Sequence, residues 1–386
     1  MKSGWAIKKL GEVCEEVKDR TSSIGVVLSA YITTDNMLKD CAGVCEAENL
    51  PPKVTSLVKF RKGDVLLSNI RPYLKKVWLA DRDGGASSDV IVFRACSKEI
   101  HPRYIWQALA RDEFFNYSML NVSGTKMPRG KREWIKQFEI PIPPLSEQKR
   151  IVEKIDAAFE KIDKLKANAE KNLANAKELF QSALDEAMRP KDGWVEKRLG
   201  EVGTTLTGMT PSTRDKSNFG NFMPFVKPAD IMPFNPINYR EEGLSQKGVS
   251  CSRLIKSDSV LMVCIGASIG KTGYADRDCT CNQQINALMP NGFDGRYLYY
   301  MLSSDKFKKK LMEDAGQATL PIINKSKWEN LSICVSLSLS EQREIVKRLD
   351  LLAEKIKILE QNYTQQIADC VEMRQAVLRE AFEGRL

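Results

Sequence analysis

The same pattern of apolar and polar positions occurs twice in the chain, beginning at Leu145 and again at Leu339, displaced by 194 residues. In each copy apolar residues recur every three or four positions for about 40 residues, which is the spacing of a long helix with a narrow apolar seam. Two such helices in one chain are expected to pair as an antiparallel coiled coil. The residues that we expect to form the seam are Ile151, Ile155, Ile162, Leu165, Ile345, Leu349, Ile356 and Leu359.

Short signals predict where these helices begin. Ser146 precedes Glu147 in the first copy, and Ser340 precedes Glu341 in the second. A serine cap followed by acidic residues satisfies free backbone amides and suits the positive end of the helix dipole. We therefore expect the two serines to be the N-caps. Because PIPP precedes the first helix and VSLS the second, the second junction lacks prolines and is expected to be less rigid.

The rest of the chain is repeated as well. The segment GWAIKKLGEV at 4–13 returns as GWVEKRLGEV at 193–202, and KKVWLADRD at 75–83 aligns with GKTGYADRD at 270–278. Residues 21–52, however, have no visible counterpart in residues 204–244. The chain is thus predicted to be two half-length copies of one scaffold, each carrying a different binding surface.

Local patterns within the copies predict a mixed fold. Short apolar runs predict strands at 65–67, 90–93, 260–265 and 284–288, and amphipathic stretches predict helices at 104–109 and 296–302. The predicted class is α+β, with two mixed α/β domains in tandem, separated and joined by two long antiparallel helices in a pseudo-twofold arrangement. We expect the domains at residues 1–144 and 191–338, and the long helical regions at 145–190 and 339–386.

The net charge of +9 is concentrated in the two predicted domains. Residues 1–144 carry +6 and residues 190–338 carry +4, whereas 145–189 are neutral and 339–386 carry −1. A basic excess fits a polyanionic partner. The sequence has no run of 18 apolar residues and no signal peptide, and its ten cysteines are typical of reduced thiols. We therefore expect a cytoplasmic protein that does not cross a membrane.

No self-contained catalytic or metal-binding set is found in the sequence. Residues 266–272 resemble a phosphate-binding loop, but three residues rather than four separate Gly266 from the Gly-Lys pair. The cysteine spacings do not form a zinc set. His101 is the single histidine, so a Cys–His or Ser–His pair could occur at most once in a two-copy chain. We predict no catalytic residue and no metal site.

Polar and basic loops remain as candidate binding residues, at equivalent places in the two copies. Cations beside glycines can approach phosphates, and Arg, Lys, Asn and Gln can contact base edges. The candidates in the first copy are Arg71, Tyr73, Lys75, Lys76, Ser87, Ser88, Lys126, Arg129, Lys131 and Arg132. The candidates in the second copy are Ser268, Lys271, Asn282, Gln283, Gln317, Thr319, Asn324, Lys325 and Lys327.

Over essentially its full length the chain resembles the specificity subunits of type I restriction–modification enzymes. The resemblance rests on the PLSEQ and LSEQ starts of the long helices, the GWxxKKLGEV-like openings, and S-x-I-G-K followed by Asn282 and Gln283. It implies two target-recognition domains that alternate with two helical regions. Each domain would read one half of an asymmetric, bipartite site in double-stranded DNA, and the paired helices would set the gap between the halves.

The resemblance also implies partners. The helices would dock two modification (methyltransferase) subunits, and restriction (translocase and nuclease) subunits would join them. This chain would be non-catalytic and bind no cofactor, with S-adenosylmethionine, ATP and Mg expected on the partner subunits. Two alternatives stay open from the residues alone: a nucleotide-binding enzyme that uses residues 266–272, and a coiled-coil adaptor without a DNA role.

Overall fold

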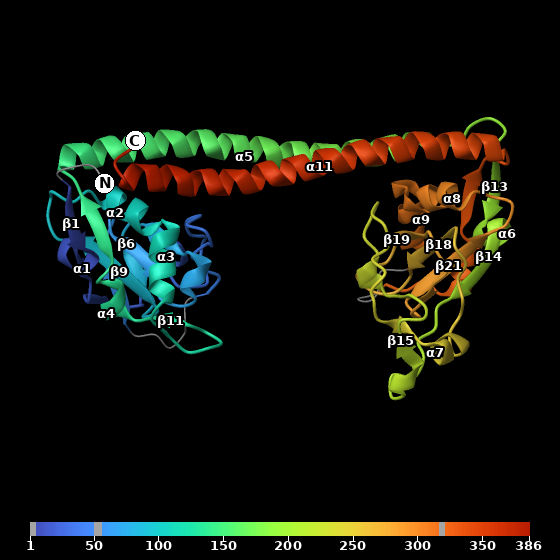
Figure 1. Cartoon of the computed structure of the whole chain (residues 1–386), viewed down its shortest axis with the longest axis horizontal. Coiled ribbons are helices and arrows are strands. Elements are labelled where there is room, and N and C mark those ends of the chain that lie inside the picture. Colours follow the sequence, from blue (N-terminus) through green and yellow to red (C-terminus); the bar gives the residue numbers. More distant parts are fainter. Residues whose placement is uncertain (1–4, 50–55, 316–320) are drawn as a thin grey trace. The chain divides into compact units, whose positions relative to one another are not determined.

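The computed structural model describes residues 5–49, 56–315 and 321–386 (Figure 1). Its contacts divide the chain into two compact units, Met1–Ala169 with Gln365–Leu386 (unit 1) and Glu170–Thr364 (unit 2). Each unit contains part of both long helices, α5 (Leu145–Ala187) and α11 (Leu339–Phe382). Within the described residues, no helix has the length and apolar character that a membrane span requires.

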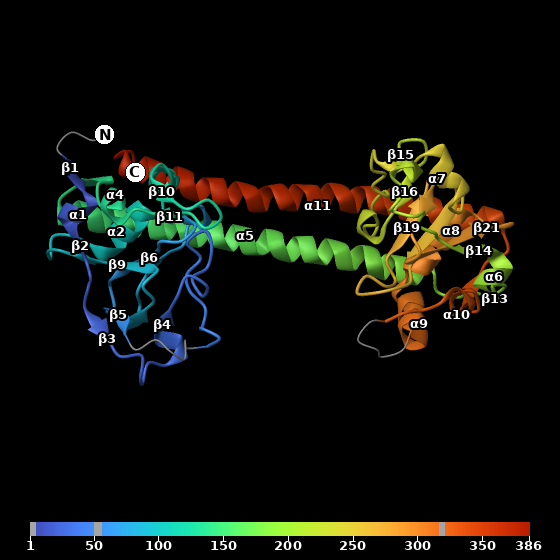
Figure 2. The ribbon, with the colours of Figure 1, turned by 90° about the horizontal axis from the view of Figure 1, so that it is seen from below.

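Unit 1 is built on a four-stranded antiparallel sheet in the order β2-β9-β6-β7. A second four-stranded sheet has the order β3-β5-β8-β4, with β4 parallel to β8, and two-stranded sheets join β1 to β12 and β10 to β11 (Figure 2). The strands are β1 (Ala6–Lys9), β2 (Cys14–Glu16), β3 (Arg20–Thr21), β4 (Tyr31–Ile32), β5 (Leu57–Phe60), β6 (Val65–Ser68), β7 (Val77–Leu79), β8 (Gly84–Ala86), β9 (Val90–Ala95), β10 (Val122–Ser123), β11 (Arg129–Gly130) and β12 (Glu139–Ile142). The short helices are α1 (Leu10–Val13), η1 (Leu28–Ala30), η2 (Pro72–Leu74), α2 (Pro102–Leu109), α3 (Asp112–Met119) and α4 (Arg132–Ile135).

Two cores cover the two faces of the main sheet in unit 1. Val65 and Leu67 of β6 pack with residues of α2 and α3, whereas Leu66 between them packs with residues of the second sheet. Successive side chains of a strand point to opposite faces, so β6 carries apolar residues on both sides and is buried throughout. The strands predicted at 65–67 and 90–93 and the helix predicted at 104–109 are confirmed as β6, β9 and α2.

Unit 2 repeats this frame with a different second layer. Its main sheet has the order β14-β21-β18-β19, and Val260 and Leu261 of β18 again belong to opposite cores. In place of a second four-stranded sheet, the described residues form the pairs β15-β17 and β16-β20, besides β13-β22. The strands are β13 (Val195–Arg198), β14 (Gly203–Thr207), β15 (Phe219–Gly220), β16 (Phe225–Val226), β17 (Gly243–Leu244), β18 (Ser259–Val263), β19 (Thr272–Ala275), β20 (Thr280–Cys281), β21 (Ile285–Pro290) and β22 (Ser332–Val335). The short helices are α6 (Leu199–Val202), η3 (Lys216–Asn218), η4 (Pro228–Asp230), α7 (Gln246–Ser250), α8 (Gly295–Ser303), α9 (Asp305–Ala315) and α10 (Lys325–Glu329).

The predicted elements of unit 2 are present with shifted ends. The strand expected at 260–265 ends at Val263, the strand expected at 284–288 is β21, and the helix expected at 296–302 is α8. The divergent segment 204–244 contains β15, β16 and β17 of unit 2. In unit 1 the segment 21–52 contains β4, whereas β5 and β8 of the second sheet lie outside it. The α+β class with repeated mixed domains is confirmed, and part of the sequence divergence lies in the second layer, which differs between the units.

The two long helices run antiparallel within unit 1. Arg374 of α11 pairs with Asp163 of α5 at 3.1 Å, and beyond the end of α11 the backbone oxygen of Leu386 accepts a hydrogen bond from Arg150 of α5 at 2.8 Å. The residue numbers of the contacting positions fall along α5 as they rise along the C-terminal segment, so the two helices run in opposite directions. The guanidinium of Arg374 also lies 4.2 Å from the ring centroid of Phe159, so the pair contains a cation–π contact as well as an ion pair.

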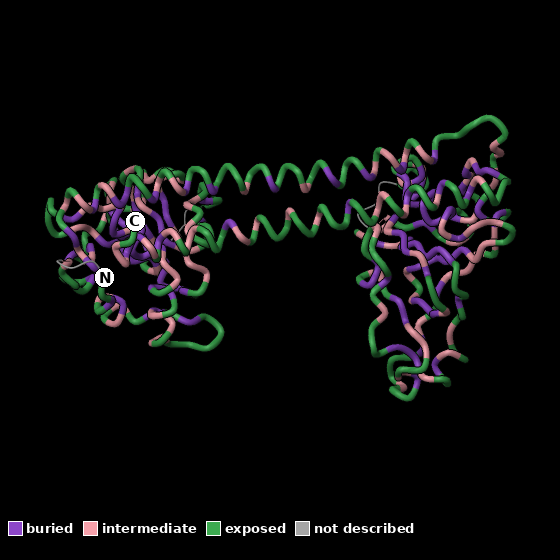
Figure 3. The backbone as a smooth tube through the Cα atoms, turned by 45° about the horizontal axis from the view of Figure 1, so that its top comes forward, coloured by how far each residue is buried: buried purple, intermediate pink, exposed green. Residues whose placement is uncertain are grey.

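Most of the predicted seam is buried, but two of its members are not. Ile151, Ile155, Ile162, Ile345, Leu349 and Ile356 are all buried. Leu165 and Leu359 are 55% and 38% exposed, so their prediction as seam residues is wrong. Between Ile162 and Ala176 the buried positions of α5 are Ile162, Ala169 and Ala176, one residue per two turns. Figure 3 accordingly shows the middle parts of the long helices mostly in the colour of exposed residues. Leu165 and Leu359 occupy the same place in the repeat, and both face outward.

The helix starts also differ from the expectation. The helices begin at Leu145 and Leu339, so Ser146 and Ser340 lie inside the first turn and are not the N-caps. In α5 the carbonyl of Pro144 accepts hydrogen bonds from the backbone N–H groups of Glu147 and Gln148 in the first turn. In α11 the hydroxyl of Ser338 accepts from the backbone N–H of Glu341 at 3.3 Å. A serine one residue before the helix thus caps α11 without the prolines of the first junction.

Candidate nucleic-acid interface

In unit 1 two distant segments cross at the end of β6. The backbone N–H of Arg71 donates to Pro128 O at 2.7 Å, and the N–H of Gly130 donates to Asn69 O at 3.1 Å. We call residues 69–71 with 128–130 the crossing of unit 1. A Cβ at Gly130 would lie 2.9 Å from the terminal methyl of Ile135 and 3.3 Å from the side-chain oxygen of Asn69, so a larger residue here would have to displace these side chains. The crossing joins two basic clusters that the sequence shows only as separate stretches.

The remaining candidates of the first copy, Ser87 and Ser88, lie in a segment that contacts the same crossing. The N–H of Asn69 donates to Asp89 O at 2.8 Å, and the guanidinium of Arg132 donates to Ser88 O at 2.7 Å. Arg129 pairs with the Asp89 carboxylate at 3.3 Å. All three candidate segments of the first copy therefore lie on one surface.

The basic side chains of this surface differ in how far they are engaged. Lys75 pairs with Asp112 at 2.5 Å, and Lys76 donates to Thr34 O at 2.5 Å, so both hold the scaffold together. Burial also lowers the pKa of Lys76. By contrast, Arg71, Lys126 and Lys131 are exposed and form no ion pair within the described residues. Tyr73 is also exposed, in η2. The latter group is available for a ligand.

Arg132 is held by a half-buried carboxylate. Glu16 of β2 pairs with Arg132 and, at 2.8 Å, with Lys136. Burial acts to raise the pKa of Glu16, but the hydrogen bonds from Lys136 and Arg132 outweigh it and hold the pKa below its usual value. The cluster attaches α4 to β2 and orients the surface that carries Lys131.

Unit 2 has the same backbone network at positions displaced by 193 to 195 residues. The N–H of Gly266 donates to Pro321 O at 3.0 Å, and the N–H of Ile323 donates to Cys264 O at 3.0 Å. The N–H of Cys264 donates to Gln284 O at 2.8 Å, as Asn69 does to Asp89. We call residues 264–266 with 321–323 the crossing of unit 2. The equivalence of the two crossings is a feature of the fold that the sequence alignment did not predict.

The remaining candidates in unit 2 surround this second crossing, mostly with local partners. Ser268 and Lys271 are half-buried in the turn between β18 and β19. Asn282 donates to Gln284 at 3.0 Å, and Gln283 is exposed and accepts from the hydroxyl of Thr210 at 2.5 Å.

The second group of unit 2 candidates lies at α10. Asn324 is the N-cap of α10, where its side chain accepts from the N–H of Lys327 at 2.9 Å. Lys325 pairs with Glu329 at 2.5 Å, whereas the side chain of Lys327 is exposed and in no ion pair within the described residues. Gln317 and Thr319 lie outside the described residues.

Two exposed or central residues of the crossings were missed by the sequence reasoning. Asn69 lies at the centre of the first crossing, and Ile322 lies exposed in the second. Ile322 is the structural equivalent of Arg129, at a displacement of 193 that none of the matched sequence blocks has.

The loop at 266–272 does not have the geometry of a nucleotide site. It links β18 to the antiparallel neighbour β19, whereas a phosphate-binding loop leads into the N-terminus of a helix. No group of three or more metal-ligating side chains occurs within the described ranges. His101 lies in the turn before α2, where burial lowers its pKa.

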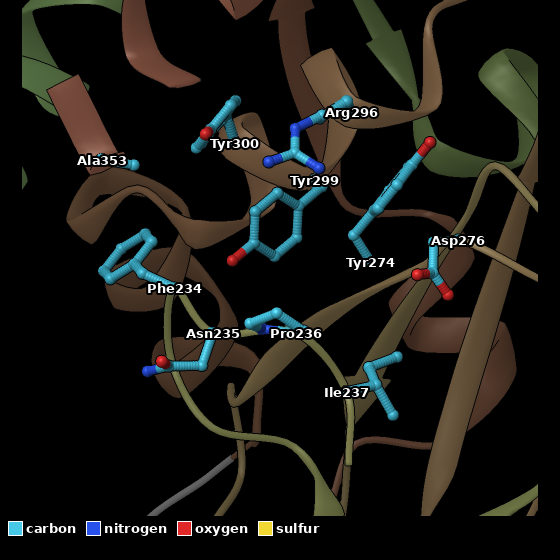
Figure 4. A pocket seen from close by; sticks show the side chains of 10 residues that line it. All are labelled: Phe234, Asn235, Pro236, Ile237, Tyr274, Asp276, Arg296, Tyr299, Tyr300 and Ala353. Carbon is cyan, nitrogen blue, oxygen red and sulfur yellow. The ribbon is translucent and has the colours of Figure 1, made fainter. Parts of the chain in front are cut away.

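A cavity of about 130 Å³ in unit 2 is lined by the turn at 234–237 and by residues of β19 and α8 (Figure 4). Its polar side chains already have partners. Arg296 pairs with Asp350 at 2.7 Å, and the hydroxyl of Tyr300 donates to the same carboxylate at 2.6 Å. Asn235 donates to Pro233 O at 3.0 Å within its own turn.

Comparison with known proteins identifies relatives along nearly the whole chain. Residues 2–174 and 191–368 match the family described as type I restriction modification DNA specificity domain. The chain is 23% identical over 416 residues to the type I restriction enzyme HindI specificity subunit of Haemophilus influenzae, which covers 86% of this chain and 89% of that protein. It is 29% identical over 176 residues to the MjaIX specificity subunit of Methanocaldococcus jannaschii, but this match spans 44% of the chain and only 40% of that relative.

Two solved structures share the fold. One, from work on complex assembly and conformational transition of the type I R-M system, has a TM-score of 0.80 and 25% identity, and the match covers 100% of this chain and 99% of that one. The HsdS subunit from Thermoanaerobacter tengcongensis has a TM-score of 0.58 and 24% identity, with coverage of 100% and 98%. The second likeness concerns the fold alone.

Proposed function

This chain belongs to the type I restriction–modification DNA specificity family, and on that premise we propose that it reads an asymmetric, bipartite site in double-stranded DNA. The curated relatives are named specificity subunits of type I restriction enzymes, and this chain is accordingly a specificity chain rather than a catalytic one. Residues 1–144 and 191–338 would be the two target-recognition domains, each reading one half of the site.

The observation that carries the proposal is the pair of crossings. The same backbone hydrogen bonds recur in both units, but the side chains on them differ: Arg71 and Arg129 in unit 1 stand where unit 2 has Gly266 and Ile322. The same backbone arrangement with different side chains is suited to binding one kind of partner, DNA, at two half-sites of different sequence. Exposed cations beside such a frame fit phosphates, and the polar groups between them fit base edges.

The long helices support the second part of the proposal, in which they set the gap and dock partners. Both carry large apolar side chains on exposed positions, where a monomeric helix would normally be polar. These are Leu165, Leu179, Leu351, Ile358, Leu359, Val371 and Met373. We propose that they bind two modification subunits, which restriction subunits then join, with S-adenosylmethionine, ATP and Mg on those partners. The assembly named in the description of the similar solved structure supports this part of the proposal.

The experiment is a map of methylated adenines in cells that carry the modification subunits with or without this chain. We expect one bipartite motif with two unlike halves when the chain is present, and its loss when the chain is deleted. Methylation that is unchanged by the deletion would contradict the proposal.

A further inference from the structure

We infer that the two units read their half-sites with different base chemistry: Arg129 binds a guanine, and Ile322 contacts the methyl group of a thymine. The inference rests on the proposed function and adds to it the kind of base that each crossing recognises.

The two residues are structurally equivalent. Arg129 is the bridge partner of Ile70, which follows the end of β6 by two residues. Ile322 is the bridge partner of Ile265, which follows the end of β18 by two residues. In each unit a proline precedes the bridging residue and accepts the hydrogen bond from the other segment. Because the backbone hydrogen bonds are equivalent, Arg129 and Ile322 project from equivalent positions of their own domains.

Both side chains are open to a ligand. The side chain of Arg129 is 52% exposed and Ile322 is 51% exposed. When a partner covers an isoleucine that is this exposed, the binding free energy becomes more favourable by about 25 cal/mol per Å² of apolar surface removed from water.

The surroundings of the two residues differ in charge as well. Near Arg129 lie a second exposed guanidinium, that of Arg71, and the carboxylate of Asp89, which holds the Arg129 guanidinium at 3.3 Å. The equivalents of these two neighbours in unit 2 are Gly266 and Gln284, neither of which carries a charge. The first crossing is therefore polar and charged, and the second is neutral, with Ile322 as its exposed apolar side chain.

The major groove offers a matching partner for each. A guanidinium donates two hydrogen bonds to O6 and N7 of guanine, which is the commonest specific contact of arginine with DNA. The methyl group of thymine is the one apolar feature of the major-groove edge and is contacted by apolar side chains. An arginine in a charged surface and an isoleucine in a neutral one thus differ in the bases that they favour.

The test uses the purified chain in complex with its modification subunits and a duplex that carries the mapped site. Guanines are replaced singly with 7-deazaguanine, which lacks N7, and thymines with deoxyuridine, which lacks the methyl group. For the wild-type chain we expect one 7-deazaguanine to weaken binding about fivefold or more. One deoxyuridine in the other half-site should weaken binding about fourfold, because the contact loses the burial of one methyl group.

The variants assign each effect to a residue. In Arg129→Ala the 7-deazaguanine effect should vanish while the deoxyuridine effect stays, and Ile322→Ala should do the opposite. Arg189→Ala and Ile7→Ala are matched controls away from the crossings, and both effects should persist in them. Ile322→Val, which removes less volume, keeps the test valid if Ile322→Ala does not fold.

The outcomes separate the inference from the proposed function. If the complex selects its mapped site but both analogue effects persist in the two variants, or if Arg129→Ala weakens all duplexes equally, the inference is overturned. If the complex shows no preference for any sequence, the proposed function itself fails.

Discussion

Gln148 in the first turn of α5 accepts a hydrogen bond from the backbone N–H of His101 at 2.9 Å. Its amide group donates to Glu99 O at 3.0 Å and to Pro143 O at 2.8 Å. Gln342 repeats the relationship in unit 2: it accepts from the N–H of Asp294 at 2.8 Å and donates to Ser336 O at 2.8 Å. The glutamine of the repeated LSEQ segment thus attaches the start of each long helix to the turn before α2 or α8.

Gln148→Ala should destabilise unit 1, because it leaves backbone groups at a buried position without partners. A buried donor or acceptor that loses its partner costs about 1–3 kcal/mol. We expect a lower midpoint of thermal unfolding, measured by calorimetry on the full chain. Gln137→Ala removes an exposed glutamine from the same unit and should leave the midpoint nearly unchanged. Equal effects of the two substitutions would contradict the role assigned to Gln148.

The cluster of Glu16, Arg132 and Lys136 predicts a pH-dependent contribution to stability. The pKa of Glu16 lies below its usual value of 4.5, so the folded state favours the charged carboxylate. The contribution is then fully present above pH 4.5 and is lost as the pH falls through the lowered value in the folded chain. In urea unfolding, the wild type should exceed Glu16→Gln at pH 7, and the difference should narrow below pH 4.5. If the difference in unfolding free energy between the wild type and Glu16→Gln grew as the pH fell, it would contradict the lowered pKa of Glu16.

Lys131 is expected to contact a phosphate, since it is exposed beside the crossing and free of ion pairs within the described residues. Lys131→Ala should weaken binding to all duplexes alike and reduce the slope of log affinity against log salt by about 0.9. Lys8→Ala removes an exposed lysine of β1 and should leave the slope unchanged. A sequence-dependent loss in Lys131→Ala would indicate a base contact instead. The measurement is a salt titration of binding by fluorescence anisotropy.

The sequence predicted what depends on local periodicity. The long helices, the strands β6 and β9 and the repeat itself all follow from spacings of two to four residues or from direct alignment. The helix caps were misplaced because the capping residue is set by where the chain enters the helix, two positions before the predicted serines. Leu165 and Leu359 were misassigned because the apolar pattern does not show how many neighbours cover each turn.

The candidate site was predicted in its parts but not in its assembly. Arg71 and Arg129 are brought together by the crossing, a long-range pairing that no local pattern encodes. For the same reason the sequence did not show that Lys75 and Lys76 are engaged by Asp112 and Thr34. Ile322 was passed over because an isoleucine normally signals core, and its exposure is visible only in the fold.

The most direct test of the account is the length of the spacer in the methylated motif. Ala169 and Tyr363 lie at or next to the ends of the compact units, at equivalent places in the two helices. Four residues inserted after each would lengthen both helices by about 6 Å, at 1.5 Å per residue. That corresponds to at most about two base pairs at 3.4 Å each.

Mapping methylated adenines for the wild type and for this double insertion tests whether the paired helices set the length of the spacer. The account predicts that both half-sites keep their sequences and that the spacer between them becomes longer. A changed half-site with an unchanged spacer would contradict it.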